Sequence, residues 1–256
     1  MNRLADNPRS DPTLWPRARP LRLEGVVVRR GSKTILDGLD LTFEAGRRYV
    51  ILGASGSGKS TLLRLLNRLE DPAEGRVMIG ETALSSLPIR PVRRAIGLVF
   101  QNPRPLPGTA RENLIYSFEI RDAKPPDSEV LANALEELGL DADRLDRDAE
   151  SLSGGEKQRL AIAMSLLAEP EILALDEPTA ALDPRSARKV AEALELRRKR
   201  DGLRSIVVTH HREHALWLGE TAVVLDRGKV SDLGPTLEVL DRADAAIWAE
   251  MEDVSS

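Results

Sequence analysis

One stretch of the sequence combines the residue types that bind phosphate groups. It runs from Gly53 to Ser60 and fits the pattern G-x-x-x-x-G-K-[ST], between an apolar run and a helical pattern. Glycines let backbone N–H groups turn inward around phosphate oxygens, and a helix start adds partial positive charge. A plain Gly/Ser turn is less favoured, because both flanks of the motif are present. The predicted phosphate-binding residues are Gly53, Ala54, Ser55, Gly56, Ser57, Gly58, Lys59, Ser60 and Thr61.

Within this loop, two side chains have separate expected roles. Lys59 would reach the outer phosphates of a nucleotide, and the hydroxyl of Ser60 would bind Mg²⁺.

Two carboxylates follow a later apolar run. Ile172–Leu175 has the pattern of a buried strand and is followed by Asp176 and Glu177. In a parallel α/β sheet, ligands bind at the carboxyl ends of the strands. Asp176 is therefore expected to hold Mg²⁺ or its water, and Glu177 to polarise the water that attacks the γ-phosphorus. The alternative is a solvated helix start, but the phosphate loop upstream favours the functional interpretation.

A second glycine-rich motif, Leu152-Ser153-Gly154-Gly155-Glu156, precedes a helical pattern that runs to about Ala168. A Ser-Gly-Gly sequence at a helix start is a second candidate anion site. Because one domain rarely needs two such sites for one γ-phosphate, the motif suggests a dimer in which this loop closes over the other subunit's nucleotide. From the motif alone, a plain helix cap is an equally good interpretation.

The elements around these motifs alternate between extended and helical patterns. The segment 110–168 is mostly helical, with interruptions at Pro125-Pro126 and Gly139. Alternation of strands and helices predicts a parallel α/β core. The expected strands include Arg47–Leu52, Ile172–Leu175, Ser205–Thr209 and Ala222–Leu225, and the expected helices include Ser60–Leu69, Ser186–Arg200 and Arg212–Leu218.

Composition narrows the possible classes of protein. The chain has 256 residues, a net charge of −4 and no cysteine. The acidic balance argues against a general DNA-binding protein, and the lack of cysteine excludes disulfide frameworks and thiolate metal sites. No apolar run is long enough to span a bilayer. Residues 1–20 are rich in Pro and Arg without an apolar stretch, which predicts a disordered tail rather than a secretory signal.

Six motifs together resemble the ATP-binding subunit of an ABC transporter, over about residues 21–230. They are the Walker A loop at Gly53–Ser60, the Q-loop glutamine Gln101, the signature motif LSGGE, the Walker B strand ILALDE, the D-loop at Ala180–Asp183 and the switch histidine His210. The resemblance implies a P-loop NTPase (RecA-like) core in residues 21–256. It also implies an antiparallel β-subdomain near residues 21–50 and an α-helical subdomain near 103–165.

The resemblance also implies an activity and partners. The chain would hydrolyse ATP with Mg²⁺ as a homodimer closed around two nucleotides, and would drive a separate membrane-spanning permease. It would lie in the cytoplasm, peripheral on the inner (plasma) membrane, with no nucleic acid bound. Glu177, His210, Lys59 and Gln101 would form the catalytic set, and Ser60, Gln101 and Asp176 would bind Mg²⁺. Ser153, Gly154, Gly155 and Glu156 would act across the dimer, and Asp183 would meet the opposite Walker A loop.

One family feature is replaced. Where the family usually has an aromatic residue that stacks on adenine, this chain has Arg30. A guanidinium can also stack on a base. Trp15 or Tyr49 could take this role instead. We expect triphosphate binding with only a weak preference for ATP over GTP.

Other classes of protein compete less well. The sequence His210-His211-Arg212-Glu213-His214 fits the zinc-peptidase pattern H-x-x-E-H, but it directly follows a predicted strand where a γ-phosphate sensor is expected. The segment between Gln101 and Ser153 is too short for the coiled-coil insertion of DNA-repair relatives. Translation-factor relatives carry two cassettes rather than one. A cassette that signals through a membrane protein without transport stays open.

The direction of transport has one indication. The segment Pro105–Leu114 resembles the compact form common in exporters, and the sequence up to Pro125-Pro126-Asp127 resembles small bacterial iron-efflux cassettes. Export, with iron or another metal as cargo, is therefore the favoured prediction, and an importer cassette is the alternative.

Overall fold

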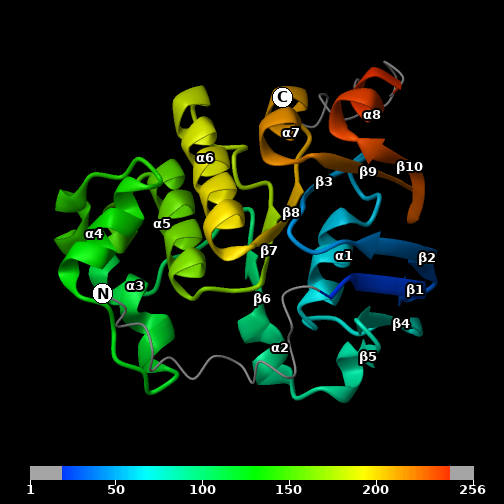
Figure 1. Ribbon diagram of the computed structural model, residues 1–256, viewed down its shortest axis with the longest axis horizontal. Helices are drawn as coiled ribbons and strands as arrows, with labels where there is room; N and C mark the ends of the chain where they lie inside the picture. The colour runs from blue at the N-terminus through cyan, green and yellow to red at the C-terminus, as the bar shows by residue number, and fades with distance from the viewer. Residues whose placement is uncertain (1–18, 243–256) are drawn as a thin grey trace.

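The structure is a computed structural model that describes residues 19–242, and Figure 1 labels its elements. The strands within these residues are β1 (Leu21–Arg30), β2 (Lys33–Phe43), β3 (Arg48–Leu52), β4 (Glu74–Ile79), β5 (Thr82–Ala83), β6 (Ile96–Val99), β7 (Ile172–Asp176), β8 (Arg204–Val208), β9 (Thr221–Asp226) and β10 (Lys229–Pro235).

Helices occupy most of the remaining chain. They are α1 (Lys59–Leu66), α2 (Ile89–Ala95), α3 (Ala110–Glu119), α4 (Ser128–Glu136), α5 (Gly154–Leu167), α6 (Pro184–Asp201), α7 (Arg212–Leu218) and α8 (Thr236–Arg242). Short 3₁₀ turns cover Leu84–Ser86, Ala142–Asp146 and Ala149–Ser151.

The central sheet has the strand order β10-β9-β3-β8-β7-β6. Strands β9, β3, β8, β7 and β6 pair in parallel, and β10 joins the edge antiparallel to β9. Parallel strands covered on both faces read as continuous apolar runs. This is why the runs at 172–175 and 205–208 predicted strands correctly, and the predicted α/β class is confirmed.

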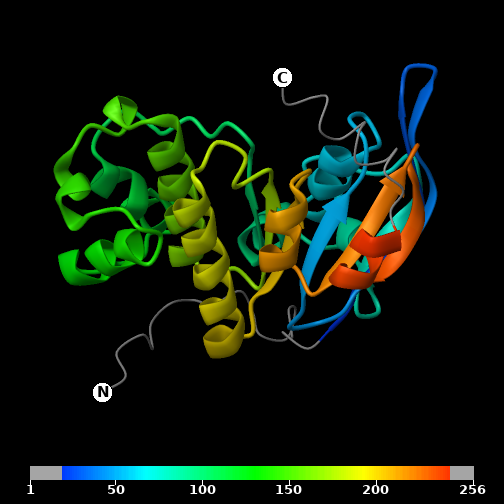
Figure 2. The ribbon, with the colours of Figure 1, turned by 90° about the horizontal axis from the view of Figure 1, so that it is seen from above.

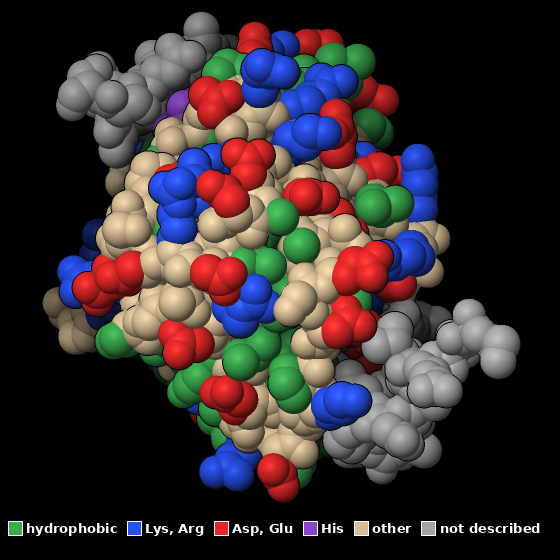
Figure 3. All heavy atoms as spheres, turned by 90° about the vertical axis from the view of Figure 1, so that its left-hand side faces the viewer, with side chains coloured by type: hydrophobic (Ala, Val, Ile, Leu, Met, Phe, Trp, Pro, Cys, Tyr) green, Lys and Arg blue, Asp and Glu red, His purple; other side chains and the backbone are tan. Residues whose placement is uncertain are grey.

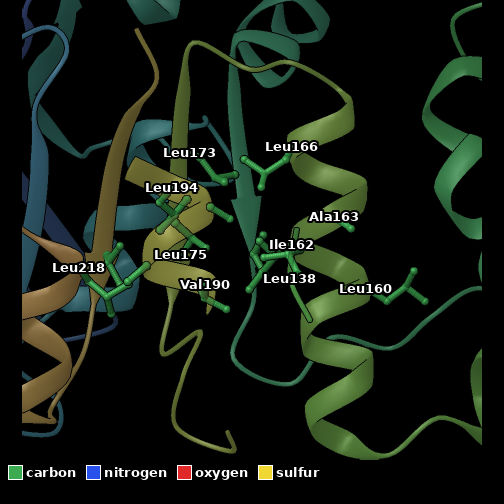
Figure 4. Close-up of a cluster of buried hydrophobic side chains, with 14 of the residues drawn as sticks. Leu138, Leu160, Ile162, Ala163, Leu166, Leu173, Leu175, Val190, Leu194 and Leu218 are labelled. Atoms are coloured by element: carbon green, nitrogen blue, oxygen red, sulfur yellow. The ribbon is translucent and has the colours of Figure 1, made fainter. Parts of the chain in front are cut away.

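Alternate residues of each central strand belong to two different cores. In β7, Leu173 and Leu175 pack into one cluster with α5, α6 and α7, whereas Ile172 and Ala174 pack into the other. Figure 4 shows the first cluster, with Leu173 and Leu175 facing Ile162 and other side chains of these helices. The central sheet is therefore packed on both faces, and this packing fixes the position of the edge formed by the carboxyl ends of its strands.

The second sheet is antiparallel, with the order β2-β1-β4-β5. It draws strands β4 and β5 from residues 74–83, beyond the range near 21–50 in which sequence reasoning placed this part. Strand β3, which lies at the end of that range, belongs to the central sheet instead. The apolar residues of β1 and β2 pack with α1 in the second core cluster, so this sheet is attached to the phosphate loop.

A group of helices lies at the far side of β7 from the antiparallel sheet. Figures 1 and 2 both show α3, α4 and α5 gathered on one side of the molecule, with α1 and β1 on the other. Helix α3 begins with a capping box in which Thr109 and Glu112 satisfy each other's backbone N–H groups. The buried amide of Asn113 donates to the carbonyls of Leu106 and Thr109, which closes the turn ahead of the helix.

Among the described residues, no helix combines the length and the apolar character required to cross a membrane. The predicted tail, residues 1–20, lies almost wholly outside the described residues, as does Trp15.

Candidate nucleotide-binding and hydrolysis site

The phosphate loop joins the end of β3 to the start of α1. Lys59 folds back over it, and its Nζ donates to the carbonyls of Gly53, at 2.7 Å, and Ala54, at 2.8 Å. The ammonium is partly buried, and burial lowers the pKa of Lys59, although Glu177 and Asp176 oppose this effect. The hydroxyl of Ser57 is buried and has no hydrogen-bond partner. The loop therefore holds the partly buried ammonium of Lys59 and the unpartnered hydroxyl of Ser57, and both can bind a ligand.

Glycine is required in this loop for reasons of space as well as conformation. Gly53 has φ +141°, and a Cβ there would lie 2.1 Å from the carbonyl oxygen of Leu225. Gly58 has φ +108° and caps α1, and a Cβ there would lie 2.6 Å from a methyl of Leu36. Because L-residues rarely adopt these angles, only glycine allows the loop to curl tightly ahead of the helix.

Asp176, Glu177 and Gln101 are brought to the same edge of the central sheet. Strands β6 and β7 are parallel, with Val99 paired to Leu175, so the residues that follow both strands leave the sheet side by side. Gln101 is exposed there. Lys59 is close enough to Asp176 and Glu177 for their charges to raise its pKa. The fold thus gathers the predicted phosphate-binding and acidic residues at one place, as expected at the carboxyl ends of parallel strands.

Glu177 and His210 form a hydrogen-bonded pair at this edge. Nδ1 of His210, just after β8, donates to Oε1 of Glu177 over 2.9 Å. Oε2 of Glu177 is buried without a partner, and Glu177 holds a strained φ of +50°. Burial raises the pKa of Glu177, while the bond to His210 opposes the rise. A basic, oriented carboxylate with one free oxygen is suited to accept a proton from water.

The Ser-Gly-Gly loop starts α5 and satisfies its own polar groups. The hydroxyl of Ser153 accepts the N–H of Glu156, and Glu156 accepts the N–H of Ser153 over 2.9 Å. Arg144 also donates to Glu156. Ser153 and Gly154 are exposed. Helix α5 packs on α3 and α4, whereas α1 packs on β2 and β7, and both helices contact β6. Figures 1 and 2 both show α5 with α3 and α4 on one side of the molecule and α1 on the other. The structure therefore keeps this loop and the phosphate loop of the same chain in different parts of the molecule.

Asp183 caps helix α6. Its side chain accepts the N–H groups of Arg185 and Ser186 at 3.0 and 3.1 Å. Hydrogen bonding to Ser186 lowers the pKa of Asp183, which keeps it ionised.

Arg30 lies beside the start of α1. Its guanidinium donates to Glu70 at 3.0 Å and to the hydroxyl of Thr61 at 3.4 Å. Sequence reasoning did not foresee Glu70 as its partner. Tyr49 is unsuitable as a base-stacking residue, because its ring is buried against Phe43 and its hydroxyl accepts the N–H of Glu44. Of the candidates considered, Arg30 is the one that borders the phosphate loop among the described residues.

The three histidines do not form a peptidase-type metal site. Within residues 19–242, no three His, Cys, Asp or Glu side chains are arranged to hold a metal ion. Instead His210 binds Glu177, and His214 binds the hydroxyl of Thr179 over 3.0 Å. Sequence reasoning noted His214 only as part of the H-x-x-E-H pattern and missed Thr179. No local pattern could have found this pair, because Thr179 lies 35 residues before His214.

Comparison with known proteins identifies the family and the fold of this chain. Residues 36–180 match the family described as ABC transporter. The chain is 39% identical to the nickel import ATP-binding protein NikO of Rhodobacter capsulatus, over 86% of this chain and 91% of that protein. It is also 39% identical to the methionine import ATP-binding protein MetN of Xanthomonas campestris, over 78% of this chain and 61% of MetN. The chain thus spans about three-fifths of the length of MetN.

A solved structure shares the fold. The ATP-binding cassette MJ0796, in a dimeric post-hydrolysis state bound to ADP and phosphate, superimposes with a TM-score of 0.76. The two are 30% identical, and the match covers 84% of this chain and 98% of that one. The chain belongs to the ABC transporter family, and its fold is that of an ABC-type ATPase. The family resemblance inferred from the six motifs is confirmed.

Proposed function

We propose that this chain is the ATP-binding and ATP-hydrolysing subunit of an ABC transporter, and that it powers transport through a separate membrane-spanning permease. The observation that carries the proposal is the bond between the buried Glu177 and the half-buried His210 at the sheet edge, adjacent to Asp176 and within electrostatic reach of Lys59. This arrangement combines a base, its orienting partner and a cation where the phosphate loop ends.

The residues divide the work of hydrolysis. Lys59 exchanges the carbonyls of Gly53 and Ala54 for the outer phosphates and neutralises their charge. Glu177 accepts a proton from the attacking water through its unpartnered Oε2, and its raised pKa makes it a stronger base. His210 holds this carboxylate in place and contacts the γ-phosphate. Because little covalent chemistry falls to the protein, positioning and charge stabilisation carry most of the rate.

The donor set at the sheet edge fits Mg²⁺. The hydroxyl of Ser60, the carboxylate of Asp176 and the amide oxygen of Gln101 are hard oxygen ligands, which this ion prefers. Bound Mg²⁺ would supply charge neutralisation between the β- and γ-phosphates. Gln101, which is exposed, would also report the state of the nucleotide to the permease.

Two copies of the chain would assemble head to tail. The exposed Ser153 and Gly154, with the half-buried Gly155, would then contact the γ-phosphate held by the partner. Glu156 would support that loop, and Asp183 would approach the partner's phosphate loop. The separation of α5 from α1 within one chain supports this, as does the dimeric state described for the similar cassette.

A mixing experiment tests the shared site. Lys59→Ala and Ser153→Ala subunits, each inactive alone, should recover hydrolysis when combined. In the mixed dimer one of the two sites keeps both an intact phosphate loop and an intact Ser-Gly-Gly loop. Two Lys59→Ala subunits, mixed in the same way under separate tags, serve as the control. No recovery in the mixed sample would contradict a site built from two chains.

The base of the nucleotide would stack on Arg30. Glu70 holds the guanidinium by its edge over 3.0 Å, which leaves the flat face available for a purine. Stacking of this kind does not distinguish adenine from guanine, so GTP should compete with ATP. A large preference for ATP in a competition assay would contradict this assignment, and an Arg30→Tyr variant is the matched comparison.

The permease would contact the helical side of the chain. Apolar side chains of Phe100, Tyr116 and Ile120 are exposed there, at 47, 43 and 63%. Figure 3 shows this side of the molecule, where hydrophobic side chains gather between charged ones. Such a surface fits a partner held by both apolar contacts and salt bridges. The chain would then sit in the cytoplasm against the inner (plasma) membrane.

Export is the proposed direction, with iron or another metal as cargo. It is supported by the compact segment between Gln101 and α3, which Thr109 and Asn113 close into a tight turn. Import is the second candidate, because NikO and MetN are named as import proteins.

Purification of the tagged chain from detergent-solubilised membranes, with mass spectrometry of its partners, tests these proposals. A co-purifying permease, reconstituted with the chain, should move metal out of the side that carries the ATPase. Movement in the opposite direction would favour import, and a membrane partner without any transport would favour signalling.

A further inference from the structure

The segment between β7 and α6, residues 177–183, carries Glu177 at one end and Asp183 at the other. Glu177, the first residue after the sheet, has a strained positive φ. The segment then turns, and two backbone hydrogen bonds hold the turn: the N–H of Ala180 donates to the carbonyl of Glu177, and the N–H of Leu182 donates to the carbonyl of Thr179. These two bonds shape the turn. A third backbone bond attaches its start to β8, where the N–H of Glu177 donates to the carbonyl of Val208 over 3.0 Å. Side-chain bonds add to this attachment.

Two side-chain bonds attach this segment to the chain that follows β8. The first joins Glu177 to His210 over 2.9 Å, and the second joins Oγ1 of Thr179 to Nδ1 of His214 over 3.0 Å. Thr179 is 1% exposed, so its hydroxyl depends on this partner. The two histidines are four residues apart, and their partners are two residues apart. Besides the backbone bond of Glu177, side chains therefore hold the segment at two adjacent points rather than one.

The second histidine is itself held in a row of stacked rings. Ring centroids are 4.1 Å apart for His210 and His211, 4.8 Å for His211 and His214, and 5.4 Å for His214 and Trp217. The guanidinium of Arg188, on α6, lies 5.2 Å from the centroid of Trp217. The imidazole of His214 has rings on both sides, and this packing fixes its plane.

We infer that His214 is a positioning residue for ATP hydrolysis: it binds Thr179, and through the turn it holds Glu177 at the orientation that His210 also requires. This inference rests on the proposed role of Glu177 as the base. Without the Thr179–His214 bond, Glu177 keeps its backbone bond to Val208 and its side-chain bond to His210. The turn beyond it loses its second side-chain attachment, so the strained backbone of Glu177 has more freedom to relax and to move the carboxylate away from the attacking water.

The charge state of the imidazole agrees with this role. Burial lowers the pKa of His214, opposed by Glu213 and reinforced by His210, so the ring is neutral near pH 7. A neutral imidazole adds no positive charge that would compete with His210 for the carboxylate of Glu177. Its contribution is a fixed hydrogen bond in a fixed ring plane.

The expected effect falls on turnover rather than on nucleotide affinity. His214→Ala and Thr179→Val should each lower kcat about tenfold, with KM for ATP within about twofold, because one buried hydrogen bond is lost and the phosphate loop is untouched. The double variant should be no slower than either single variant. His214→Asn and Thr179→Ser keep polar atoms near the original positions and should recover most of the rate.

A control and a second readout separate positioning from general weakening of the fold. Leu216→Ala, on the same helix but 42% exposed and outside the ring stack, should keep wild-type kcat. The chain has three histidines, so their imidazole NMR signals can be resolved, with His214→Asn assigning one of them. Thr179→Val should shift the signals of both His214 and His210. Because Thr179→Val is nearly isosteric, this readout remains even where an alanine variant fails to fold.

Several outcomes would overturn the inference: unchanged kcat in the folded His214→Ala and Thr179→Val variants, a loss that appears in KM alone, or a Thr179→Val spectrum with all three imidazoles unmoved. Glu177→Gln, measured in the same assay, tests the base separately. If it hydrolysed ATP normally, the proposed base would be wrong. The NMR signals of Thr179→Val would still show whether Thr179 and His214 are bonded.

Discussion

Two glycine-rich helix starts in this chain solve the same local problem in opposite ways. At α1, the first N–H groups are left without side-chain caps, Gly58 takes a φ of +108°, and Lys59 binds only backbone carbonyls of its own loop. At α5, Ser153 and Glu156 cap each other. The first start is incomplete and needs an anion to satisfy it, whereas the second is complete within the chain.

The difference between the two helix starts indicates that the one at α1 binds a ligand within its own chain, whereas the one at α5 does not need one. An unsatisfied helix start in a tight, glycine-only loop is costly unless a ligand binds, so the structure itself points to phosphate. A capped helix start with glycines in ordinary helical conformation is stable as it is. A Cβ on Gly155 would lie 3.1 Å from a methyl of Leu182, so the packing of its own chain explains that glycine. A Cβ on Gly154 would meet nothing within 4 Å, and the proposed approach of a partner's nucleotide would explain this second glycine.

The largest expected effect concerns the base beside the α1 loop. Glu177→Gln should lower turnover by about 10²–10⁴-fold, because an amide cannot accept the proton from water. ATP binding should persist, and the variant should accumulate as an ATP-bound dimer, measured by gel filtration and steady-state hydrolysis. The exposed Glu136→Gln serves as the control. Normal hydrolysis by Glu177→Gln would show that Glu177 is not the base.

An intermediate effect is expected on the unfolding free energy, with opposite signs for substitution of Gly53 and of Gly154. Gly53→Ala should cost about 2–4 kcal/mol of unfolding free energy, because its Cβ would lie 2.1 Å from a backbone oxygen at a φ of +141°. Gly154→Ala should instead stabilise α5 by about 0.5–1 kcal/mol, since alanine favours the helix.

Despite its stable fold, Gly154→Ala should weaken ATP-driven dimerisation, because the new methyl group would stand between the loop and the partner's nucleotide. Denaturant unfolding and ATP-dependent gel filtration measure the two effects. Equal destabilisation by both glycine substitutions would contradict the contrast between the two helix starts.

The smallest expected effect is a pair of opposite pH dependences. Hydrogen bonding to Ser153 lowers the pKa of Glu156, so its carboxylate stabilises the fold at neutral pH and loses that contribution as pH falls below about 4.3. Burial raises the pKa of Glu177, so its ionised form destabilises the fold above the raised pKa.

At pH 7, Glu156→Gln should therefore lower the unfolding free energy by up to about 1 kcal/mol, and Glu177→Gln should raise it. Both differences from wild type should shrink on acidification. Chemical denaturation at several pH values measures them, and changes of the same sign would show that the two carboxylates do not differ in environment as the structure indicates.

Much of the site was predictable from the sequence because its chemistry is local. The phosphate loop, the Asp176–Glu177 pair after an apolar strand and the Ser153–Glu156 cap each lie within a few consecutive residues. The central strands were also predictable, because strands buried on both faces leave uninterrupted apolar runs. Helix α7 was predicted with its observed limits, Arg212–Leu218.

The remaining features required the tertiary structure, because they join residues far apart in the chain. The addition of β4 and β5 to the antiparallel sheet leaves no local pattern, since short strands of mixed polarity resemble loops. The pairing of Arg30 with Glu70 spans 40 residues, and the bond between Thr179 and His214 spans 35. The sequence alone was enough to predict the phosphate loop, because its residues are consecutive. Only the tertiary structure decided how Glu177 is held, because Val208, His210 and the Thr179–His214 bond bring together distant parts of the chain.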